Sequence, residues 1–307
     1  MSENWTVNNI PDQSGKIIII TGANSGIGYE SARELVRKGA EVIVASRDPI
    51  KADRAISKIR KEIPEAKLKF IKVDLANLKS IRKFTEVFKA NYGRLDILLN
   101  NAGIMLIPYG KTHDGFENTV GVNHLGHFTL TGLLMDRLSS TPGARVVNVA
   151  SNAHYAGEMD FDNLLFENGH EYAPMKAYGR SKLANLLFTY ELQRRFQSRD
   201  HDVIALAAHP GIAATSLANH LFFNLISWLI QPVMKMIFQS SAMGALPSLR
   251  AAVDPGARGG QYYGPDGKGE KSGYPIIVDS NPASKNEKDA RTLWQISEEL
   301  TGIKYLD

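Results

Sequence analysis

KIIIITGANSGIG, residues 16–28, places four consecutive isoleucines directly before a turn that contains Gly22, Gly26 and Gly28. An unbroken apolar run of this length predicts a parallel strand that is buried on both faces of its sheet. The glycines let backbone N–H groups approach a phosphate at the N-terminus of the next helix, which we expect over Ile27–Lys38. The stretch therefore predicts a site for a dinucleotide diphosphate, although a plain strand-to-helix corner has the same composition.

The length and composition of the chain favour one large α/β domain. It has 307 residues, of which 43% are hydrophobic, enough to bury a large core. We expect a single domain over residues 1–307, with residues 1–14 as a polar tail that lacks the apolar core of a signal peptide. A cytoplasmic location is the default expectation. The absence of cysteine excludes disulfides, thiolate metal sites and a cysteine nucleophile.

The net charge is +4, and many of the basic residues lie between Lys51 and Lys89. There is no basic arm and no pattern of interleaved aromatic residues, so nucleic acid is not an expected partner. Solvated helix faces explain the charge, and a positive surface also steers an anionic cofactor toward its cleft.

Strand-like segments alternate with amphipathic stretches of helical length. This alternation predicts βαβ units and a doubly wound, mostly parallel seven-stranded sheet with helices on both faces, a Rossmann-type α/β fold. We expect a loop over residues 256–273 and a last helix from about Asn286 to Leu300, with Leu293, Trp294 and Ile296 facing inward. The expected strands are Lys16–Thr21, Glu41–Ala45, Leu68–Val73, Ile97–Leu99, Arg145–Ala150, Val203–Ala207 and Tyr274–Val278.

Residues 216–240 contain the most apolar segment, LFFNLISWLIQPVMKMIF at 221–238. It is too short and too interrupted by polar residues and Pro232 to span a bilayer comfortably. Three interpretations remain: a buried helix pair, a lid over an apolar substrate, and a peripheral membrane-surface patch.

Residues that follow the expected strands predict the adenosine end of the site. After the second strand, Ser46 and Arg47 stand where NAD-specific sites place an acid, and a guanidinium pairs with a 2'-phosphate, so NADP is favoured. The alternative makes Arg47 a solvated cation and Asp48 the ribose ligand. Asp74 ends the third strand, either as an adenine ligand or as a helix cap, and Asn101 follows the fourth strand.

Tyr178 and Lys182 lie four residues apart in a segment with a helical apolar pattern, so both project from one face. An ammonium beside a phenol is expected to lower the tyrosine pKa and make the phenol a proton donor and acceptor. Ser151 ends the fifth strand, where its hydroxyl would bond a substrate carbonyl. Asn123 lies inside a long helix, where an amide holds a water or orients a neighbour. Each of these residues also has an ordinary structural interpretation.

The ordered set TGxxxGxG, NNAG, Asn123, Ser151, Tyr178-x-x-x-Lys182 and PG-x-x-x-Thr215 resembles the short-chain dehydrogenase/reductase superfamily over about residues 14–300. Within it the chain is similar to the retinol dehydrogenases, WW-domain oxidoreductases and protochlorophyllide reductases. The features are WTVNNIPDQSGK at the start, SRD after the second strand, the long gap from Ser151 to Tyr178, SKLAN and the closing LWQISEELTGI.

The resemblance implies a catalytic tetrad of Asn123, Ser151, Tyr178 and Lys182, in which Asn123 supports a water-borne proton path. It also implies NADP(H) as the cofactor, with Lys182 on the nicotinamide ribose, and pairing in a homodimer. The cofactor-binding residues predicted in this way are Gly22, Asn24, Ser25, Gly26, Ile27, Gly28, Arg47, Asp74, Leu75, Asn101, Ala102, Gly103, Tyr178, Lys182, Pro210, Gly211 and Thr215. Many relatives read VSS where this chain has Ala150 before Ser151, a change that spares the catalytic serine.

These patterns predict an NADP-dependent oxidoreductase that interconverts a carbonyl and an alcohol on a small lipophilic substrate. An NADP-binding sensor or scaffold with little turnover is the alternative. An epimerase or dehydratase is disfavoured, because those relatives carry GxxGxxG at the glycine turn. His124, His127, His154 and His209 show no metal-ligand spacing, so no metal site is expected. Substrate identity and the direction of the reaction stay open.

Overall fold

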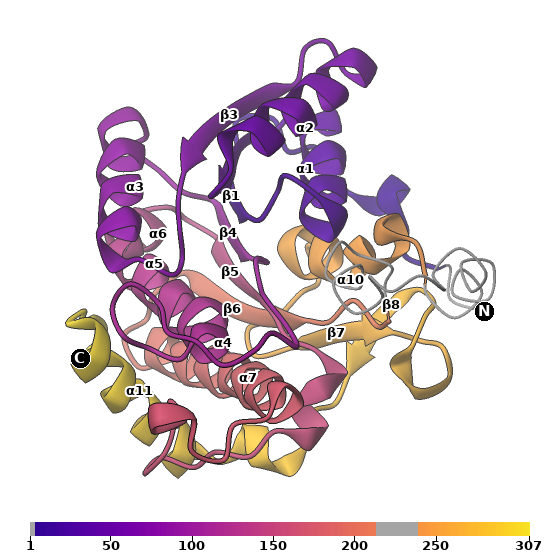
Figure 1. Cartoon of the computed structure of the whole chain (residues 1–307). Coiled ribbons are helices and arrows are strands. Elements are labelled where there is room, and N and C mark those ends of the chain that lie inside the picture. The colour runs from indigo at the N-terminus through magenta and orange to yellow at the C-terminus, as the bar shows by residue number, and fades with distance from the viewer. Residues whose placement is uncertain (1–3, 213–238) are drawn as a thin grey trace, which may run out of the picture.

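The computed structural model describes residues 4–212 and 239–307, and one eight-stranded sheet runs through them (Figure 1). The strand order is β3-β2-β1-β4-β5-β6-β7-β8. Every neighbouring pair is parallel except β7 and β8, which are antiparallel. The strands are β1 Ile17–Thr21, β2 Glu41–Ser46, β3 Lys67–Lys72, β4 Ile97–Asn100, β5 Ala144–Val149, β6 Val203–Ala208, β7 Tyr262–Pro265 and β8 Pro275–Val278.

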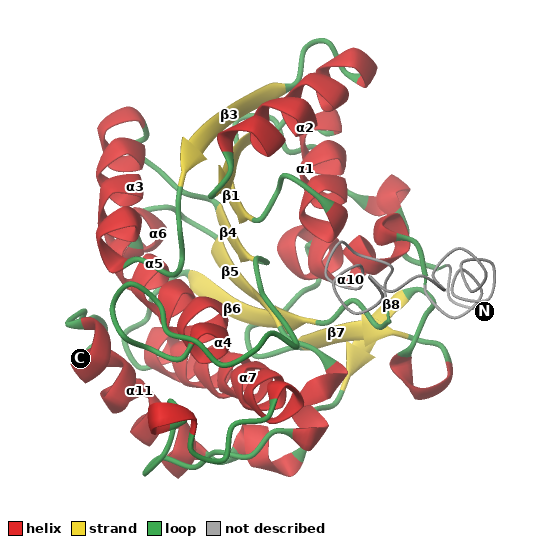
Figure 2. Ribbon diagram, viewed as in Figure 1, coloured by secondary structure: helices red, strands yellow, loops and turns green. Residues whose placement is uncertain are grey.

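Helices cover both faces of the sheet, as Figure 2 shows. Side chains of α1, α2 and α10 build the core on one face, and those of α3, α5, α6, α7 and α11 build it on the other. The helices are α1 Gly26–Arg37, α2 Pro49–Glu62, α3 Leu78–Asn91, α4 Asn118–Val120, α5 Gly126–Leu133, α6 Met135–Ser139, α7 Pro174–Gln197, α10 Ser241–Val253 and α11 Glu287–Thr301. A π-helical turn, Gly121–Leu125, joins α4 to α5. Short 3-10 helices span Val7–Asn9, Asn152–Ala156, Glu167–Gly169, Lys268–Glu270 and Pro282–Lys285.

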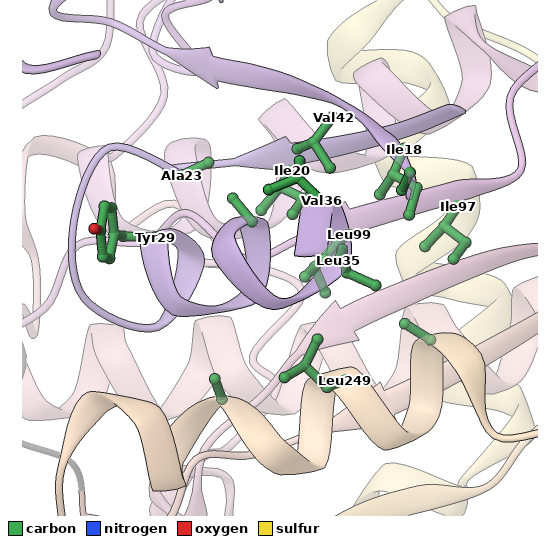
Figure 3. Packing of buried hydrophobic residues seen from close by; sticks show 14 of the residues in the cluster. Ile18, Ile20, Ala23, Tyr29, Leu35, Val36, Val42, Ile97, Leu99 and Leu249 are labelled. Carbon is green, nitrogen blue, oxygen red and sulfur yellow. The ribbon is translucent and has the colours of Figure 1, made fainter. Parts of the chain in front are cut away.

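Strand β1 lies at the centre and is buried on both faces, as the isoleucine run predicts. Ile18 and Ile20 point into one core, where they meet α1 and α10 (Figure 3), and Ile19 points into the other. All three are fully buried. The alternation of side chains along a strand therefore joins the two layers through four apolar residues.

The doubly wound, mostly parallel fold is confirmed, but the prediction of seven strands was one short. Strand β7 lies inside residues 256–273, which we expected to be a loop. A strand of four residues that contains Gly264 and Pro265 has little strand propensity of its own. Pairing on both sides makes it a strand, because Tyr263 is in register with Ala208 of β6 and with Ile277 of β8.

The two ends of the described chain pack against the core. Trp5 and Ile10, within the expected tail, are buried in the cluster that contains α1 and α10. At the other end α11 begins and ends within one residue of the expected positions, with Leu293 and Trp294 buried and Ile296 half-buried. Among the described helices, none combines the length and apolar character that crossing a membrane requires.

Leu249→Ala tests the core that holds β1 in place. Leu249 of α10 is fully buried in the cluster with Ile18 and Ile20, so truncation leaves a cavity and should lower the free energy of unfolding by about 3 kcal/mol. Urea unfolding followed by circular dichroism measures the change. Ile50→Ala is the control, since Ile50 is 63% exposed and should change the value by no more than about 0.5 kcal/mol. Equal effects of the two variants would contradict the packing.

Candidate active site

A cleft of about 440 Å³ lies at the carboxyl ends of β1 to β4. Ligands of open α/β sheets bind at this edge, where the strand order reverses on either side of β1. Seven of the predicted cofactor residues line the cleft: Gly22, Asn24, Arg47, Asp74, Leu75, Ala102 and Gly103. Ser25 and Gly26 line a neighbouring groove, which shares Asn24 and Lys51 with the cleft. Ile27 instead packs in the core.

The glycine turn brings backbone close to backbone. Gly22 has a φ of +70°, which few L-residues adopt. A Cβ atom on Gly28 would lie 2.5 Å from the carbonyl oxygen of Gly22 and 2.6 Å from the side-chain nitrogen of Asn101. Only glycine fits there, so the first turn of α1 can stand directly over the turn with its N-terminal N–H groups toward a ligand.

Asn101 holds the glycine turn rather than lining the cleft. Its side-chain Nδ2 donates to the Thr21 carbonyl at 2.8 Å, and its backbone N–H donates to the Thr21 hydroxyl at 2.9 Å. The N–H of Ala102 donates to the same hydroxyl at 2.9 Å. Asn101 thus fixes the end of β4 against the end of β1, and its place beside the adenosine ribose stays a prediction.

The alternative role of Asp74 as a helix cap was wrong. Helix α3 begins four residues later and is capped by Asn77, whose Oδ1 accepts from the Ser80 N–H at 3.1 Å. Asp74 Oδ1 accepts from the N–H of Ala76 at 3.0 Å and shapes the loop along the cleft.

Arg47 and Asp48 both line the cleft after β2. Asp48 also caps α2, because its Oδ1 accepts from the Lys51 N–H at 3.1 Å. Lys51 lines the same cleft, so this end of it carries two cations beside one carboxylate that already has a hydrogen-bond donor.

Helix α7 carries Tyr178 and Lys182 past the carboxyl end of β5. The Lys182 ammonium is buried, donates to the carbonyl of Val149 at 2.9 Å and lies 5.7 Å from the centre of the Tyr178 ring. Ser151 follows β5 and caps the next 3-10 turn, since its Oγ accepts from the Ala153 N–H at 3.2 Å. That bond leaves the Ser151 hydroxyl hydrogen free to be donated.

The environment raises the pKa of Tyr178 above its ordinary value. Burial of the phenol is the main cause, and hydrogen bonding with Ser151 opposes it. We expected Lys182 to lower this pKa, but the ammonium is itself desolvated, and burial lowers the Lys182 pKa to about 8. Tyr178 is therefore protonated at neutral pH and suited to give a proton to a developing alkoxide.

Asn123 lies in the π-helical turn Gly121–Leu125, in which the Gly126 N–H donates to the carbonyl of Gly121, five residues back. Its Oδ1 accepts from the Ile104 N–H at 2.8 Å, and its Nδ2 donates to the Ile104 carbonyl at 2.9 Å and to the Ser181 hydroxyl at 3.0 Å. Both side-chain N–H groups are thus taken by protein acceptors. The amide joins the loop after β4 to helix α7, which is the orienting role among those expected.

Two buried histidines bond the backbone of predicted catalytic residues. The Thr21 hydroxyl accepts two N–H groups, so it donates to His127 Nε2 at 2.9 Å, and His127 Nδ1–H donates to the Asn123 carbonyl at 3.1 Å. His154 Nε2 accepts from the Asn281 N–H, so His154 Nδ1–H donates to the Ser151 carbonyl at 2.7 Å. These tautomers follow from the hydrogen-bond network. Burial lowers the pKa of His127 to about 4 and also lowers that of His154.

Arg180, inside the YGRSK motif, is a further residue that the sequence did not single out. It is fully buried, and its guanidinium lies 4.0 Å from the centre of the Phe166 ring. It donates to the carbonyl groups of Glu158, Asn163 and Leu164 at 2.6–3.1 Å. Arg180 thereby fixes the long segment between Ser151 and Tyr178 onto helix α7. A charged residue inside a helix with buried neighbours was the available signal.

The remaining predicted residues lie at the end of β6 or outside the described chain. Pro210 and Gly211 follow β6, next to the end of β5, since the Ala150 N–H donates to the Ala208 carbonyl at 2.8 Å. Thr215 and the apolar segment 221–238 lie outside the described residues, so its three interpretations stay open.

The family model for short chain dehydrogenases matches residues 16–224. The chain belongs to this family of oxidoreductases. Within it the chain groups with the retinol dehydrogenases, as the resemblance implied. It is 43% identical to mouse retinol dehydrogenase 12, covering 95% of this chain and 88% of that protein. It is 39% identical to human polyprenol dehydrogenase, covering 95% and 87%.

Solved structures share the fold of this dehydrogenase. An uncharacterised protein from Mycobacterium paratuberculosis superposes with a TM-score of 0.82 and 38% identity, and the match covers 99% of each chain. A short chain dehydrogenase from Shigella flexneri, solved with NADP, has a TM-score of 0.63 and 22% identity, covering 82% of this chain and 97% of that chain.

The stability of this dehydrogenase should fall in mild acid because of His124. Burial lowers the His124 pKa from its ordinary 6.5 to about 3, so between these pH values the unfolded chain binds a proton that the folded chain does not. Stability is therefore lost as the pH falls below 6.5, by about 2 kcal/mol at pH 5. His124→Phe removes this part of the pH dependence and suits the neighbouring Phe128 and Phe188 rings.

Urea unfolding at pH 7.5 and pH 5 measures the effect. His113→Asn is the control, since His113 is exposed and the variant should keep the pH dependence of the wild type. The assignment fails if His124→Phe loses as much stability between the two pH values as the wild type does.

Proposed function

We propose that the chain is an NADP-dependent oxidoreductase that interconverts a carbonyl and an alcohol on a lipophilic substrate, with Tyr178 as the general acid and base. The observation that carries the proposal is the pairing of a protonated Tyr178 phenol with the Ser151 hydroxyl and with Lys182, whose ammonium lies beside Gly103 in the lining of a nucleotide-sized cleft. The retinol and polyprenol dehydrogenases are named for lipophilic alcohols, and this supports the substrate class.

The residues of the cleft fit a dinucleotide with a 2'-phosphate. Gly28 keeps space open over the turn that a side chain would fill. Arg47 and Lys51 supply positive charge at the β2 end. Beside them the Ser46 hydroxyl is buried and has no hydrogen-bond partner among the described residues, which favours a ligand that can bond it. NADP(H) would supply the hydride.

The chain's own groups account for the proton. In the reducing direction Tyr178 gives its phenolic proton to the carbonyl oxygen, and the Ser151 hydroxyl donates a hydrogen bond to the same oxygen as charge builds there. Lys182 uses one N–H on the Val149 carbonyl, so two remain for the ribose hydroxyls and for the phenolate. Asn123 keeps the loop after β4 and helix α7 in register around these groups.

Tyr178→Phe should lower kcat by about 10³-fold, because the general acid is removed, while NADPH affinity changes by less than about threefold. NADPH oxidation with a panel of apolar aldehydes and ketones gives the rate, and fluorescence titration gives the affinity. Tyr155→Phe, at an exposed tyrosine, should retain full activity. Unchanged turnover in Tyr178→Phe would reject the assignment. A wild type that binds NADPH tightly but reduces no carbonyl would instead favour the sensor.

Arg47→Asp should raise the KM for NADPH by about 10- to 100-fold, the loss expected for a charge-assisted phosphate contact. The KM for NADH, which has no 2'-phosphate, should stay the same or fall. Lys83→Asp makes the same charge change on a side chain that is 75% exposed on α3, and it should alter neither constant. If NADPH and NADH lose affinity equally in Arg47→Asp, Arg47 does not read the 2'-phosphate.

A further inference from the structure

His209 and the loop that joins β7 to β8 form a buried polar contact that the proposed chemistry leaves unused. His209 follows β6 and is fully buried, with its ring 5.2 Å from that of Tyr262. Its Nε2 lies 2.8 Å from Glu270 Oε2, in the loop Asp266–Gly273. A partly exposed loop carboxylate is thus bonded to an imidazole that has no solvent exposure.

The hydrogen bonds of His209 fix which nitrogen carries its proton. Its Nδ1 accepts from the backbone N–H of Gly211 at 3.2 Å. Nε2 therefore bears the hydrogen and donates it to Glu270. The bonds run in one direction, from the Gly211 N–H through the imidazole to the carboxylate. They connect the predicted cofactor-binding residues Pro210 and Gly211 to a loop about 60 residues later in the chain.

The carbonyl groups of the same loop also accept hydrogen bonds from the segments that follow β6 and β5. The Lys271 carbonyl accepts from the Ile212 N–H at 2.8 Å. On the other side Asn152, next to Ser151, directs its Nδ2 toward the carbonyl groups of Gly269 and Glu270 at 3.4 Å. The loop therefore bridges the ends of β5 and β6.

Two backbone conformations depend on this arrangement. Gly211 has a φ of +62°, and a Cβ atom there would lie 2.5 Å from the Lys271 carbonyl oxygen. Glu270 has a φ of +54°, a left-handed conformation that is unfavourable for a residue with a side chain. Such strain persists where surrounding contacts enforce it, and it gathers at functional sites.

We propose that Glu270 is a positioning residue that acts through His209 to hold the Pro210–Gly211 turn, and so sets the distance between the hydride carrier and the Ser151–Tyr178 pair. The inference rests on the proposed function. The residues predicted to hold the diphosphate and the 2'-phosphate take no part in this contact, so its loss is expected to misplace the reacting end without releasing the cofactor. A small displacement of reacting groups lowers the chemical step strongly.

Glu270→Ala should lower kcat by about 10- to 30-fold, with the Kd for NADPH within about threefold of the wild type. The deuterium kinetic isotope effect on NADPH oxidation should rise, since hydride transfer becomes slower than product release. Glu270→Gln keeps an acceptor for Nε2–H and should restore kcat to within about threefold of the wild type. Lys268→Ala, in the same exposed loop, is the control and should leave all three constants unchanged.

His209→Asn tests whether Glu270 acts through the imidazole. It removes the contact with Glu270, and adding Glu270→Ala to it should cause no further loss of kcat. Additive losses would overturn the inference, as would a Glu270→Ala enzyme with wild-type kcat and isotope effect, or a Glu270→Gln enzyme as slow as the alanine variant. If Glu270→Ala does not fold, the glutamine variant and the double-mutant comparison with Glu270→Gln decide the question.

The wild type separates this inference from the proposed function. A wild type without NADPH-dependent turnover of any carbonyl would reject the proposed function. An active wild type whose rate does not respond to Glu270→Ala would reject the positioning role alone.

Discussion

The hydroxyl group of Thr21 is the contact on which the rest of the site depends. It accepts the backbone N–H groups of Asn101 and Ala102 and donates to His127. One oxygen atom therefore joins the glycine turn after β1, the loop after β4 and the helix that carries Asn123. Each of these segments contributes to the cofactor cleft or the catalytic set, and their relative placement depends on one fully buried side chain of three heavy atoms.

Burial sets the protonation of the whole site. His127 and His154 are neutral because charging them would cost solvation, and as neutral rings each offers one donor and one acceptor in fixed positions. The same desolvation keeps Tyr178 protonated and lowers the pKa of Lys182 to about 8. The site thus places a protonated phenol beside an ammonium whose pKa, about 8, lies close to neutral pH. Its hydrogen-bond directions are fixed before any ligand enters.

The fold could be predicted from the sequence where a local pattern carried its own physical reason. The isoleucine run of β1 predicts burial on both faces from its own composition. The Tyr178–Lys182 spacing likewise predicts that both side chains lie on one helix face. Strand β7 could not be predicted, because its four residues become a strand only by pairing with two partners distant in the chain. The same limit applies to Asn101, whose amide is used on Thr21 some 80 residues away. The partners of the histidines could not be predicted either, because some are backbone atoms, such as the Ser151 carbonyl for His154, and others are side chains distant in the chain, such as Glu270 for His209.

Because of the π-helical turn at Gly121–Leu125, the geometry of the active site depends on the number of residues in this part of the chain. A turn of this kind accommodates one residue more than an α-helical turn, and this offset lets the Asn123 carbonyl meet the His127 ring instead of serving only the helix. Removing a single residue before Asn123 would leave every side chain of the tetrad in the sequence, yet rotate the amide by roughly 100° around the helix axis. The number of residues between the start of α4 and Asn123 is therefore as important to the site as the asparagine itself.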